Sequence, residues 1–361
     1  MRLDLDEQIF AIQRYGGISR MFAELARQFV TNAVPDVELL PIDAPIVTRY
    51  ILDHPELSGP LKAREARNEW TALARYMSRI RKATACDVVH NTFYLPHGLA
   101  PIRGAKRVVT VHDMIPELLP GTRRLDRLTL KRHYVERADH VICVSEATRR
   151  DLLRVFGQVK APVSVVHHGV DGRFHPGVPR LGFLPERYVL FVGNRDAYKD
   201  ADVLFRAFAI VAANDPDLQL LCVGGTGLSA REVDQLTTLG IRDRVSQQHL
   251  PDDAMASAYT HAEVFVFPSR FEGFGMPALE AMASGTPTIL ANATSLPEVG
   301  GDAAAYFEPG RADELAEVIT TVLGDAGLRA RMVTAGLERA SGFTWRRAAD
   351  RTADVYRGLL Q

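Results

Sequence analysis

The sequence lacks the features of secreted, membrane-spanning and disulfide-stabilised proteins. It has 3 cysteines in 361 residues, and the odd number and wide spacing of Cys86, Cys143 and Cys222 indicate neither a disulfide framework nor a zinc site. No apolar run approaches the roughly 18 residues of a membrane-spanning helix. The first residues, MRLDLDEQIF, form neither a basic nor an apolar leader segment. We therefore expect a cytoplasmic protein, either free in the cytosol or attached peripherally to the inner face of the cytoplasmic membrane.

Extremes of composition are also absent. Hydrophobic residues make up 47% of the chain and charged residues 24%, which excludes collagen-like, disordered and coiled-coil classes. The chain is too long for one core to fill comfortably. At roughly 150 residues per domain, its length predicts two or three domains.

The formal net charge of -1 conceals two halves of opposite charge. Residues 1–180 hold 27 Lys and Arg against 20 Asp and Glu, an excess of +7. Residues 181–361 hold 16 against 24, an excess of -8. The basic half is expected to face an anionic partner, for which a phospholipid surface, a lipid-phosphate acceptor and nucleic acid are the candidates.

Short β-branched runs alternate with amphipathic helical patterns in both halves, which predicts parallel sheets flanked by helices. The expected strands are 86–91, 106–113, 140–145, 163–170, 188–193, 218–225, 264–269 and 287–292. The expected helices are 18–31, 61–83, 125–138, 146–156, 200–214, 229–239, 252–261 and 277–284. The pattern predicts an α/β fold of two doubly wound, Rossmann-like domains with a ligand cleft between them.

The stretch RFHPGVPRLGFLPERY, residues 173–188, is rich in Pro and Gly and lacks periodicity. It is therefore expected to contain the domain linker. We predict domains over residues 1–178 and 179–343. An amphipathic C-terminal helix over 344–361 is expected to cross back to the first domain.

The segment PSRFEGFGMPALEAMASGTP, residues 268–287, carries the strongest chemical signal. It follows a buried strand, turns at Gly275 and is expected to begin a helix at Met276 or Pro277, because proline suits the first helical position. The backbone N–H groups of Phe274, Gly275 and Met276 would then project from the positive end of a helix. Such groups can hold hydroxyls or an anion.

Two carboxylates flank this turn. Glu272 precedes it, and Glu280 is expected in the first helical turn. Their separation along the chain does not require the close pair, roughly 5 to 5.5 Å apart, that a retaining glycosidase uses. It favours two separate anchors for one extended polyhydroxy ligand. The alternative is that Glu280 only stabilises the helix N-terminus and Glu272 is solvated.

The spacing Glu272-x7-Glu280 within FEGFGMPALEAMASGTP resembles the signature of retaining nucleotide-sugar glycosyltransferases of the GT-B fold, specifically glycosyltransferase family 4. Similar segments follow the family order along nearly the whole chain: YGGISR, TVHD, VICVSEATRRDL, HHGVDGRFHP, GNRDAYKDADVLFRAF, CVGGTG and SLPEVGGDAA. The resemblance implies that Glu280 holds the ribose hydroxyls. It also implies that Glu272 contacts the donor sugar beside the backbone of residues 274–277, where Phe274, Gly275, Met276 and Pro277 bind the donor.

Arg195 and Lys199 follow an expected strand directly, in GNRDAYK. The resemblance implies that both bind the donor and act in catalysis by neutralising the leaving diphosphate, with Arg195 as a bidentate guanidinium. The family often has Asn after the lysine, whereas this chain has Asp200. The alternative is a pair of solvated loop cations.

Two segments of the first half are expected to complete the site. Gly16 and Gly17 lead into a helix, and the resemblance implies that their loop closes over the donor phosphates, with a weaker contribution from Arg20. His112 ends the strand KRVVTVHD, and the resemblance places it close to the transferred sugar as a catalytic residue. The alternative for a lone histidine is a structural role.

Near the nucleobase, the resemblance implies contacts from Gly225 and from the backbone around His249 and Leu250. The segment CVGGTG lacks the third downstream glycine of a dinucleotide fingerprint, which argues against NAD(P). The acidic pairs in Asp4–Asp6 and Asp215–Asp217 are not expected at the carboxyl end of a strand. We therefore predict metal-independent catalysis without a cofactor, in which the nucleotide sugar is a substrate.

The implied function is a retaining hexosyltransferase. Its acidic C-terminal half binds the nucleotide diphosphate sugar, and its basic half presents a hydroxyl of a glycan or lipid-linked acceptor. YGGISR and TVHDMIPE are most similar to bacterial enzymes of O-antigen, lipopolysaccharide and exopolysaccharide synthesis, many of them mannosyltransferases. GDP-mannose is thus the first expected donor, ahead of UDP-sugars. The alternatives are a GT-B sugar-nucleotide epimerase and a non-catalytic nucleotide-sugar-binding subunit; no motif indicates nucleic acid.

A basic segment over residues 61–82 is the expected membrane contact. It is rich in Lys and Arg, and Trp70, Leu73, Met77 and Ile80 recur in it at helical spacing. Such a helix can lie on anionic lipid. The alternative is a surface helix whose apolar stripe packs on the sheet.

Overall fold

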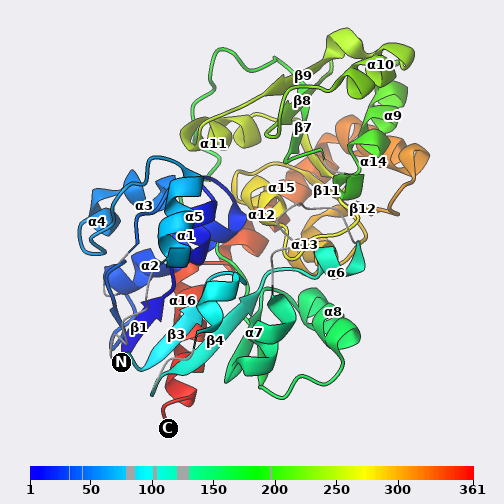
Figure 1. The fold of residues 1–361 in the computed structure, drawn as a ribbon. Coiled ribbons are helices and arrows are strands. Elements are labelled where there is room, and N and C mark those ends of the chain that lie inside the picture. Colours follow the sequence, from blue (N-terminus) through cyan, green and yellow to red (C-terminus); the bar gives the residue numbers. More distant parts are fainter. Residues whose placement is uncertain (32, 43, 79–85, 101–103, 120–129, 196) are drawn as a thin grey trace. The chain divides into compact units, whose positions relative to one another are not determined.

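The computed structural model describes residues 1–361 except 32, 43, 79–85, 101–103, 120–129 and 196 (Figure 1). The described residues form two compact units. Met1–Gly169 and Thr344–Gln361 make up the N-terminal unit, and Val170–Phe343 makes up the C-terminal unit. The division after Gly169 falls earlier than the expected boundary at residue 178. The first and last residues of the C-terminal unit meet there, since the Val170 N–H donates to the Phe343 carbonyl at 3.0 Å. The limits of independently folding domains stay a prediction.

The N-terminal unit contains, among its described residues, a six-stranded parallel sheet in the order β2-β1-β3-β4-β5-β6. Its strands are β1 (Arg2–Leu5), β2 (Glu38–Leu39), β3 (Val88–Asn91), β4 (Lys106–Val111), β5 (His140–Cys143) and β6 (Val163–Val165). Every strand pair in it is parallel. The chain reverses its direction of winding between β1 and β3, which makes their carboxyl ends a topological switch point.

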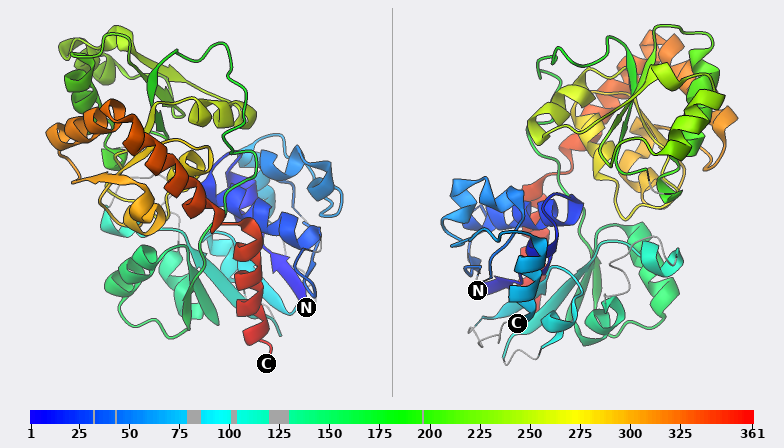
Figure 2. Two further views of the ribbon diagram at one scale, coloured as in Figure 1. Left: turned by 180° about the vertical axis from the view of Figure 1, so that it is seen from behind. Right: turned by 45° about the horizontal axis from the view of Figure 1, so that its top comes forward.

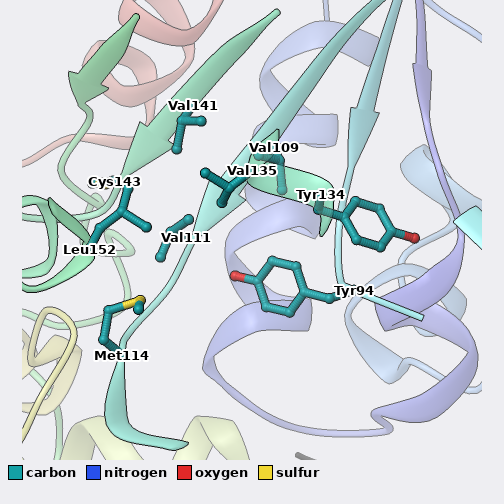
Figure 3. Close-up of a cluster of buried hydrophobic side chains, with 9 residues drawn as sticks. All are labelled: Tyr94, Val109, Val111, Met114, Tyr134, Val135, Val141, Cys143 and Leu152. Atoms are coloured by element: carbon teal, nitrogen blue, oxygen red, sulfur yellow. The ribbon is translucent and has the colours of Figure 1, made fainter. Parts of the chain in front are cut away.

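Helices and buried side chains surround this sheet. The helices of the unit are α1 (Gln8–Ile12), α2 (Gly17–Val30), α3 (Arg49–Leu52), α4 (Pro55–Ser58), α5 (Glu69–Ser78), α6 (Ile115–Leu118), α7 (Lys131–Arg137), α8 (Glu146–Phe156) and α16 (Trp345–Gly358). Figure 3 shows a core cluster in which side chains of β4 and β5 meet Tyr134 and Val135 of α7 and Leu152 of α8. The β-branched residues of these strands fit such a buried pleated surface, since they lose little side-chain freedom there.

The C-terminal helix α16 belongs to the N-terminal unit although it follows the C-terminal unit in sequence. Figure 2 shows it beside the N-terminal sheet, and it packs against α2. Its buried face includes Trp345, Ala349 and Tyr356. The Tyr356 Oη lies 2.6 Å from Nδ1 of His90 in β3, so a buried polar contact joins the last helix to the sheet.

The C-terminal unit contains, in the described part of the chain, a second six-stranded parallel sheet in the order β12-β11-β10-β7-β8-β9. Its strands are β7 (Tyr188–Val192), β8 (Gln219–Val223), β9 (Val245–Gln248), β10 (Val264–Phe267), β11 (Thr288–Ala291) and β12 (Ala305–Phe307). Its helices are α9 (Ala201–Ala212), α10 (Ala230–Thr238), α11 (Asp252–Thr260), α12 (Met276–Ala283), α13 (Leu296–Gly300), α14 (Ala312–Gly324) and α15 (Ala326–Ser341). The winding reverses between β7 and β10, so their carboxyl ends form the switch point of this unit.

The expected α/β class with two doubly wound sheets is confirmed. The expected helix over 61–83 is wrong in its first part, because α5 begins only at Glu69 and Glu65 forms a parallel bridge with Ile46. Residues 79–83 of that helix, and 125–129 of the one expected over 125–138, lie outside the described residues. In the described part of the chain, no helix combines the length and apolar character needed to cross a bilayer.

Candidate functional site

Two predicted residues meet at the switch point of the C-terminal unit. Lys199 lies in the loop after β7 and Glu272 in the loop after β10, and the Lys199 ammonium donates to Glu272 Oε1. Their side chains are only 15% and 11% exposed. The ammonium also lies 5.0 Å from the centre of the Phe267 ring and 5.4 Å from that of Tyr198. This aromatic backing stabilises a cation at the edge of the sheet where open α/β folds bind ligands.

A second ion pair joins the same two loops. Arg270 Nε donates to Asp200 Oδ2 at 2.5 Å, and the Arg270 N–H donates to the Tyr198 carbonyl at 2.8 Å. The hydrogen bond to Asp200 raises the pKa of Arg270. Asp200 is buried and adopts the left-handed conformation, with a φ of 53°. Asp200, which stands where the family often has Asn, is thus ion-paired with Arg270. This ion pair fixes the backbone beside Lys199.

The expected turn before α12 is present, and it requires glycine. Gly275 is the N-cap of α12 with a φ of 105°, and Pro277 lies in the first turn after Met276. A Cβ at Gly275 would lie 2.8 Å from Leu296 Cδ2. The first N–H groups of a helix have no intrahelical acceptors. The N-terminus of α12 can therefore donate hydrogen bonds to an anion or to hydroxyl oxygens of a ligand.

Two hydroxyl groups that the sequence did not single out hold the Glu272 loop in place. The Glu272 N–H donates to Thr294 Oγ1 at 3.0 Å. Ser295 Oγ lies 3.0 Å from the Glu272 carbonyl and 2.9 Å from the Phe274 carbonyl. Ser295 begins the family-like segment SLPEVGGDAA, but only the fold shows that this segment supports the carboxylate loop.

Glu280 is buried in α12 just after the first helical turn, so its expected place within that turn is wrong. Its Oε2 accepts a hydrogen bond from Tyr259 Oη of α11 at 2.9 Å. A buried hydroxyl thus orients this carboxylate. The contact gives Glu280 a fixed direction, which a solvated helix-terminal acid would lack.

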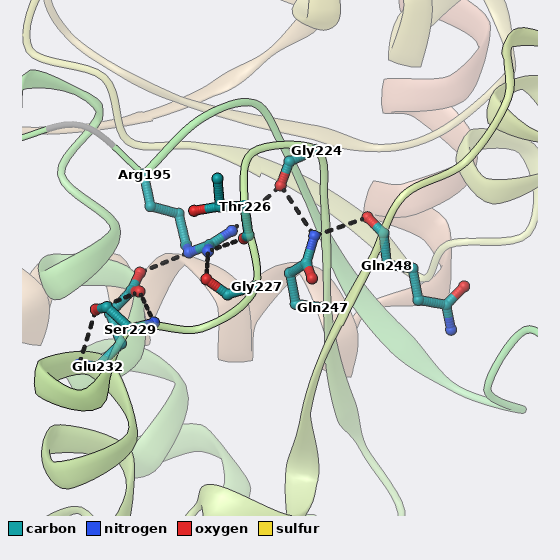
Figure 4. Close-up of polar contacts among 8 residues, drawn as sticks. All are labelled: Arg195, Gly224, Thr226, Gly227, Ser229, Glu232, Gln247 and Gln248. Atoms are coloured by element: carbon teal, nitrogen blue, oxygen red, sulfur yellow. Dashed lines mark hydrogen bonds and ion pairs between the residues drawn. The ribbon is translucent and has the colours of Figure 1, made fainter.

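Arg195 is held by the turn that follows β8 (Figure 4). Its Nη1 donates to the Gly224 carbonyl at 3.2 Å, and its Nη2 donates to the carbonyls of Thr226 at 2.6 Å and Gly227 at 3.1 Å. Nε pairs with Glu232 Oε1 at 2.5 Å, and the side chain is 5% exposed. Because all three nitrogens already donate to protein acceptors, Arg195 does not present the free bidentate fork that the sequence predicted.

The residues expected near a nucleobase border the same turn. Gly224 and Gly225 have φ angles of 92° and 71°, in the region that favours glycine. Gln247 of β9 donates from Nε2 to the Gly224 carbonyl at 3.2 Å (Figure 4). Leu250 follows β9 and is half-buried, while His249 is exposed. Gly225 and the end of β9 are thus neighbours of the Arg195 cluster.

The remaining predicted residues lie in the N-terminal unit. Gly16 is the N-cap of α2, which begins at Gly17, and Ser19 Oγ donates to the Gly16 carbonyl at 3.1 Å. His112 follows β4 and is buried. The ring of Phe22 in α2 meets the His112 ring edge-on, with centroids 5.7 Å apart. The glycine-led helix and His112 therefore belong to one packed cluster.

Metal ligands do not cluster in the part of the chain that the structure describes. No group of three or more His, Cys, Asp and Glu side chains there is arranged to hold a metal ion. The expectation that the Asp4–Asp6 pair lies away from the carboxyl end of a strand is wrong, because β1 ends at Leu5 and Asp6 follows it directly. Asp6 is buried there and accepts a hydrogen bond from the Thr92 N–H at 2.8 Å. Metal-independent catalysis stays a prediction.

Comparisons with known proteins identify the family of the chain. Residues 181–339 match the family described as "Glycosyl transferases group 1", and residues 15–173 match "Glycosyltransferase Family 4". O-antigen chain mannosyltransferase B of Escherichia coli is 28% identical over 286 residues, which are 74% of this chain and 73% of that protein. D-inositol 3-phosphate glycosyltransferase 1 of Catenulispora acidiphila is 33% identical over 307 residues, 76% of this chain and 73% of that protein.

A solved structure shares the fold. HepE of Anabaena in complex with UDP-glucose aligns with a TM-score of 0.77 at 18% identity and covers 99% of both chains. The fold and the family matches thus define a GT-B glycosyltransferase. The chain belongs to glycosyltransferase family 4, a family of retaining hexosyltransferases, which confirms the resemblance drawn from its motifs.

Proposed function

We propose that this protein transfers a hexose from a nucleotide diphosphate sugar to a hydroxyl of a glycan or lipid-linked acceptor in the synthesis of a bacterial surface polysaccharide. The reaction retains the anomeric configuration and uses no metal. The Lys199–Glu272 pair at the switch point of the C-terminal unit is the observation that carries this proposal. A cation and a hydrogen-bonding carboxylate lie together there, beside the N-terminus of α12.

Each group of the C-terminal unit has a chemical task in this proposal. Lys199 and the N-terminus of α12 stabilise the negative charge that grows on the departing diphosphate. Glu272 accepts hydrogen bonds from sugar hydroxyls. Glu280, oriented by Tyr259, accepts them from the ribose. Gly225 and Leu250 border the nucleobase.

For the N-terminal unit we propose the roles that the family resemblance implies. Gly16 and Gly17 offer backbone N–H groups to the donor phosphates at the start of α2. His112 contacts the transferred sugar. The charge excess of residues 1–180 suits a lipid-linked or otherwise anionic acceptor.

Mannose from GDP-mannose is the first donor that we propose. The similarity to the E. coli O-antigen chain mannosyltransferase supports mannose. The UDP-glucose complex of HepE keeps UDP-sugars as the competing donor class. A thermal-shift panel of GDP, UDP, ADP and their sugars separates these classes. Stabilisation by GDP but not UDP is expected, and the reverse result would replace the proposed donor.

Product analysis tests the reaction itself. Purified protein is incubated with the stabilising nucleotide sugar, with and without membrane-extracted glycolipid acceptors. Transfer of labelled hexose to the acceptor fraction is expected. Conversion of the donor to an isomer without any acceptor would instead show an epimerase. Nucleotide-sugar binding with no turnover on any acceptor would favour a non-catalytic subunit.

We also propose that α5 contacts anionic lipid. Trp70 is 81% exposed, and Met77, two helical turns later on the same face of α5, is also exposed, while Ala72 and Tyr76 are buried. The described part of the expected apolar stripe therefore faces outward at Trp70 and Met77, and Leu73 beside them is half-buried. Ile80 lies outside the described residues. An exposed aromatic ring among basic residues is typical of interfacial helices.

Vesicle co-sedimentation tests the membrane contact. Wild-type protein should bind vesicles that contain 30 to 50 mol% phosphatidylglycerol, roughly tenfold better than pure phosphatidylcholine vesicles. Trp70→Ala with Met77→Ser should abolish most of this difference. Leu153→Ser in α8, another exposed apolar residue of the unit, is the matched control. Equal binding to vesicles with and without phosphatidylglycerol would overturn the proposed membrane contact.

A further inference from the structure

The contacts of Arg195 involve a residue that neither the family signature nor the proposed chemistry uses. Glu232 lies in the third position of α10 and forms a capping box with Ser229. Its Oε2 accepts from the Ser229 N–H and Oγ, both at 2.7 Å. Oε1 remains directed at Arg195 Nε. One carboxylate therefore links the helix N-terminus to the guanidinium.

The electrostatics favour an ionised carboxylate at this place. Burial raises the pKa of Glu232, but the hydrogen bonds from Ser229 and the Arg195 guanidinium together lower it below its ordinary value. The side chains of Arg195 and Glu232 are 5% and 18% exposed. Charge-assisted hydrogen bonds between such groups are stronger than neutral ones and hold both partners in one geometry.

A count of donors shows what the pair leaves for a ligand. A guanidinium has five N–H donors. Four of them are used by the acceptors on Gly224, Thr226, Gly227 and Glu232. Among the described contacts this leaves one N–H, on Nη1. The arrangement suits a single hydrogen bond to a phosphate oxygen and fixes the turn at the same time.

We propose that Glu232 is a positioning residue for the donor diphosphate. It acts through Arg195, holding the guanidinium on the Gly224–Gly227 turn so that the turn keeps its shape and one Nη1 N–H faces the ligand. This inference rests on the proposed donor binding by the C-terminal unit. Gln247 supports the turn from the opposite side through the Gly224 carbonyl.

The opposite effect is expected if Glu232 has no positioning role. A carboxylate near a diphosphate repels it, so its removal would strengthen binding. If Glu232 does position Arg195, removal of its carboxylate should weaken nucleotide binding, because a guanidinium without its partner no longer holds the turn. The direction of the change in nucleotide affinity therefore separates the two roles.

Glu232→Gln and Ser229→Ala form a matched pair of variants. Gln at this position still completes a capping box but removes the carboxylate from Arg195. Ser229→Ala removes the hydroxyl of the box and leaves the Arg195–Glu232 pair. Arg195→Lys keeps a positive charge but cannot serve four acceptors with three donors.

Hydrogen–deuterium exchange of the nucleotide-free protein tests the turn directly. Glu232→Gln and Arg195→Lys should speed exchange in the peptide that covers residues 222–228 by roughly tenfold. Ser229→Ala should leave this peptide near the wild-type rate. Equal exchange in all four proteins would overturn the inference, and this measurement needs no nucleotide.

Calorimetry with GDP and UDP tests the consequence for binding. For the nucleotide that binds wild-type protein, Glu232→Gln should raise the Kd about 10- to 30-fold, while Ser229→Ala should change it less than about threefold. An unchanged or lower Kd for Glu232→Gln would overturn the positioning role. If wild-type protein binds none of the nucleotides and nucleotide sugars of the thermal-shift panel, the proposed donor function fails, whereas the exchange result still decides the role of Glu232.

Discussion

Lys199 donates a hydrogen bond to Glu272 across the switch point of the C-terminal sheet, although 73 residues of sequence separate them. The two parallel strands β7 and β10 are neighbours, so the loops after them begin at the same edge. A cation and a carboxylate meet there, each more than four-fifths buried. For the proposed reaction, this pair would orient both groups before a donor binds, and we expect that to lower the reorganisation during catalysis.

Lys199→Ala should lower turnover roughly 100- to 1,000-fold, because it removes positive charge that stabilises the leaving diphosphate. Glu272→Ala should have a comparable effect through the sugar hydroxyls. Release of nucleoside diphosphate from the donor sugar measures both. Arg311→Ala removes another ion-paired cation of the same unit, at the exposed contact with Asp313, and should leave turnover unchanged. Near-wild-type turnover in a folded Lys199→Ala protein would contradict the assignment of Lys199 to the active site.

Two substitutions at Asp200 test what stabilises the loop that carries Lys199. Asp200→Asn should lower the free energy of unfolding by less than about 1 kcal/mol, since Asn also tolerates the left-handed conformation. Asp200→Val should lower it by about 2 kcal/mol or more, because a β-branched residue is strained at a positive φ. Urea denaturation of the two variants measures the difference. Equal destabilisation would show that the ion pair with Arg270, and not the backbone, decides stability here.

Local sequence was sufficient for the carboxylate loop. A buried strand, Gly275 and Pro277 follow one another within a few residues, so turn and helix chemistry predicted both the loop and the start of α12. The supports of that loop were not predictable in this way. Thr294 reaches the Glu272 backbone across 22 residues, and Glu232 reaches Arg195 across 37. Such contacts depend on the order of the strands in the sheet, and a local sequence pattern does not predict that order.

Several strands and helices of the structure were not expected from the sequence. The strands β2 and β12 are only two and three residues long, so an alternating pattern has too few positions to be recognised. Length does not explain the missed strand β1, since β3 and β10 have the same four residues and were expected. The helices α14 and α15 are absent from the predicted elements although α14 buries Leu315, Ile319 and Val322 at helical spacing. The acceptors around Arg195 were not predictable for another reason: spacing identifies a cation but not its partners in the fold. The contact of Arg195 with the donor stays a prediction.

Gly275→Ala should damage both the fold and donor binding. A Cβ would meet Leu296 at 2.8 Å, and the φ of 105° is strained for alanine, so we expect a loss of about 2 kcal/mol in the free energy of unfolding. Gly324→Ala at the end of α14 is the control, since a Cβ there meets no atom within 4 Å. Thermal denaturation compares the two. A Gly275→Ala protein as stable as Gly324→Ala would contradict the close approach to Leu296.

His90 should make the N-terminal unit sensitive to acid. Burial, and then the charge of His112, lower the pKa of His90 to about 3, against 6.5 for an unperturbed histidine. Between these values the unfolded chain binds a proton that the folded chain does not. Stability is therefore fully present above about pH 6.5 and falls as the pH drops toward 3, by up to about 1.4 kcal/mol per pH unit for this group. His168, whose pKa burial also lowers to about 3, adds a slope of the same sign.

His90→Gln separates the contribution of His90 from that of His168. The variant should be less stable than wild type at pH 7.5, because it disturbs the buried contacts with Tyr356 and Thr110. Between pH 7 and pH 5, however, it should lose about 1 to 2 kcal/mol less than wild type, since one titrating group is gone. Urea denaturation at several pH values measures this slope, with the exposed His133→Gln as a control expected to follow wild type. Parallel curves for wild type and His90→Gln would mean that the buried contact between β3 and α16 does not carry the acid sensitivity.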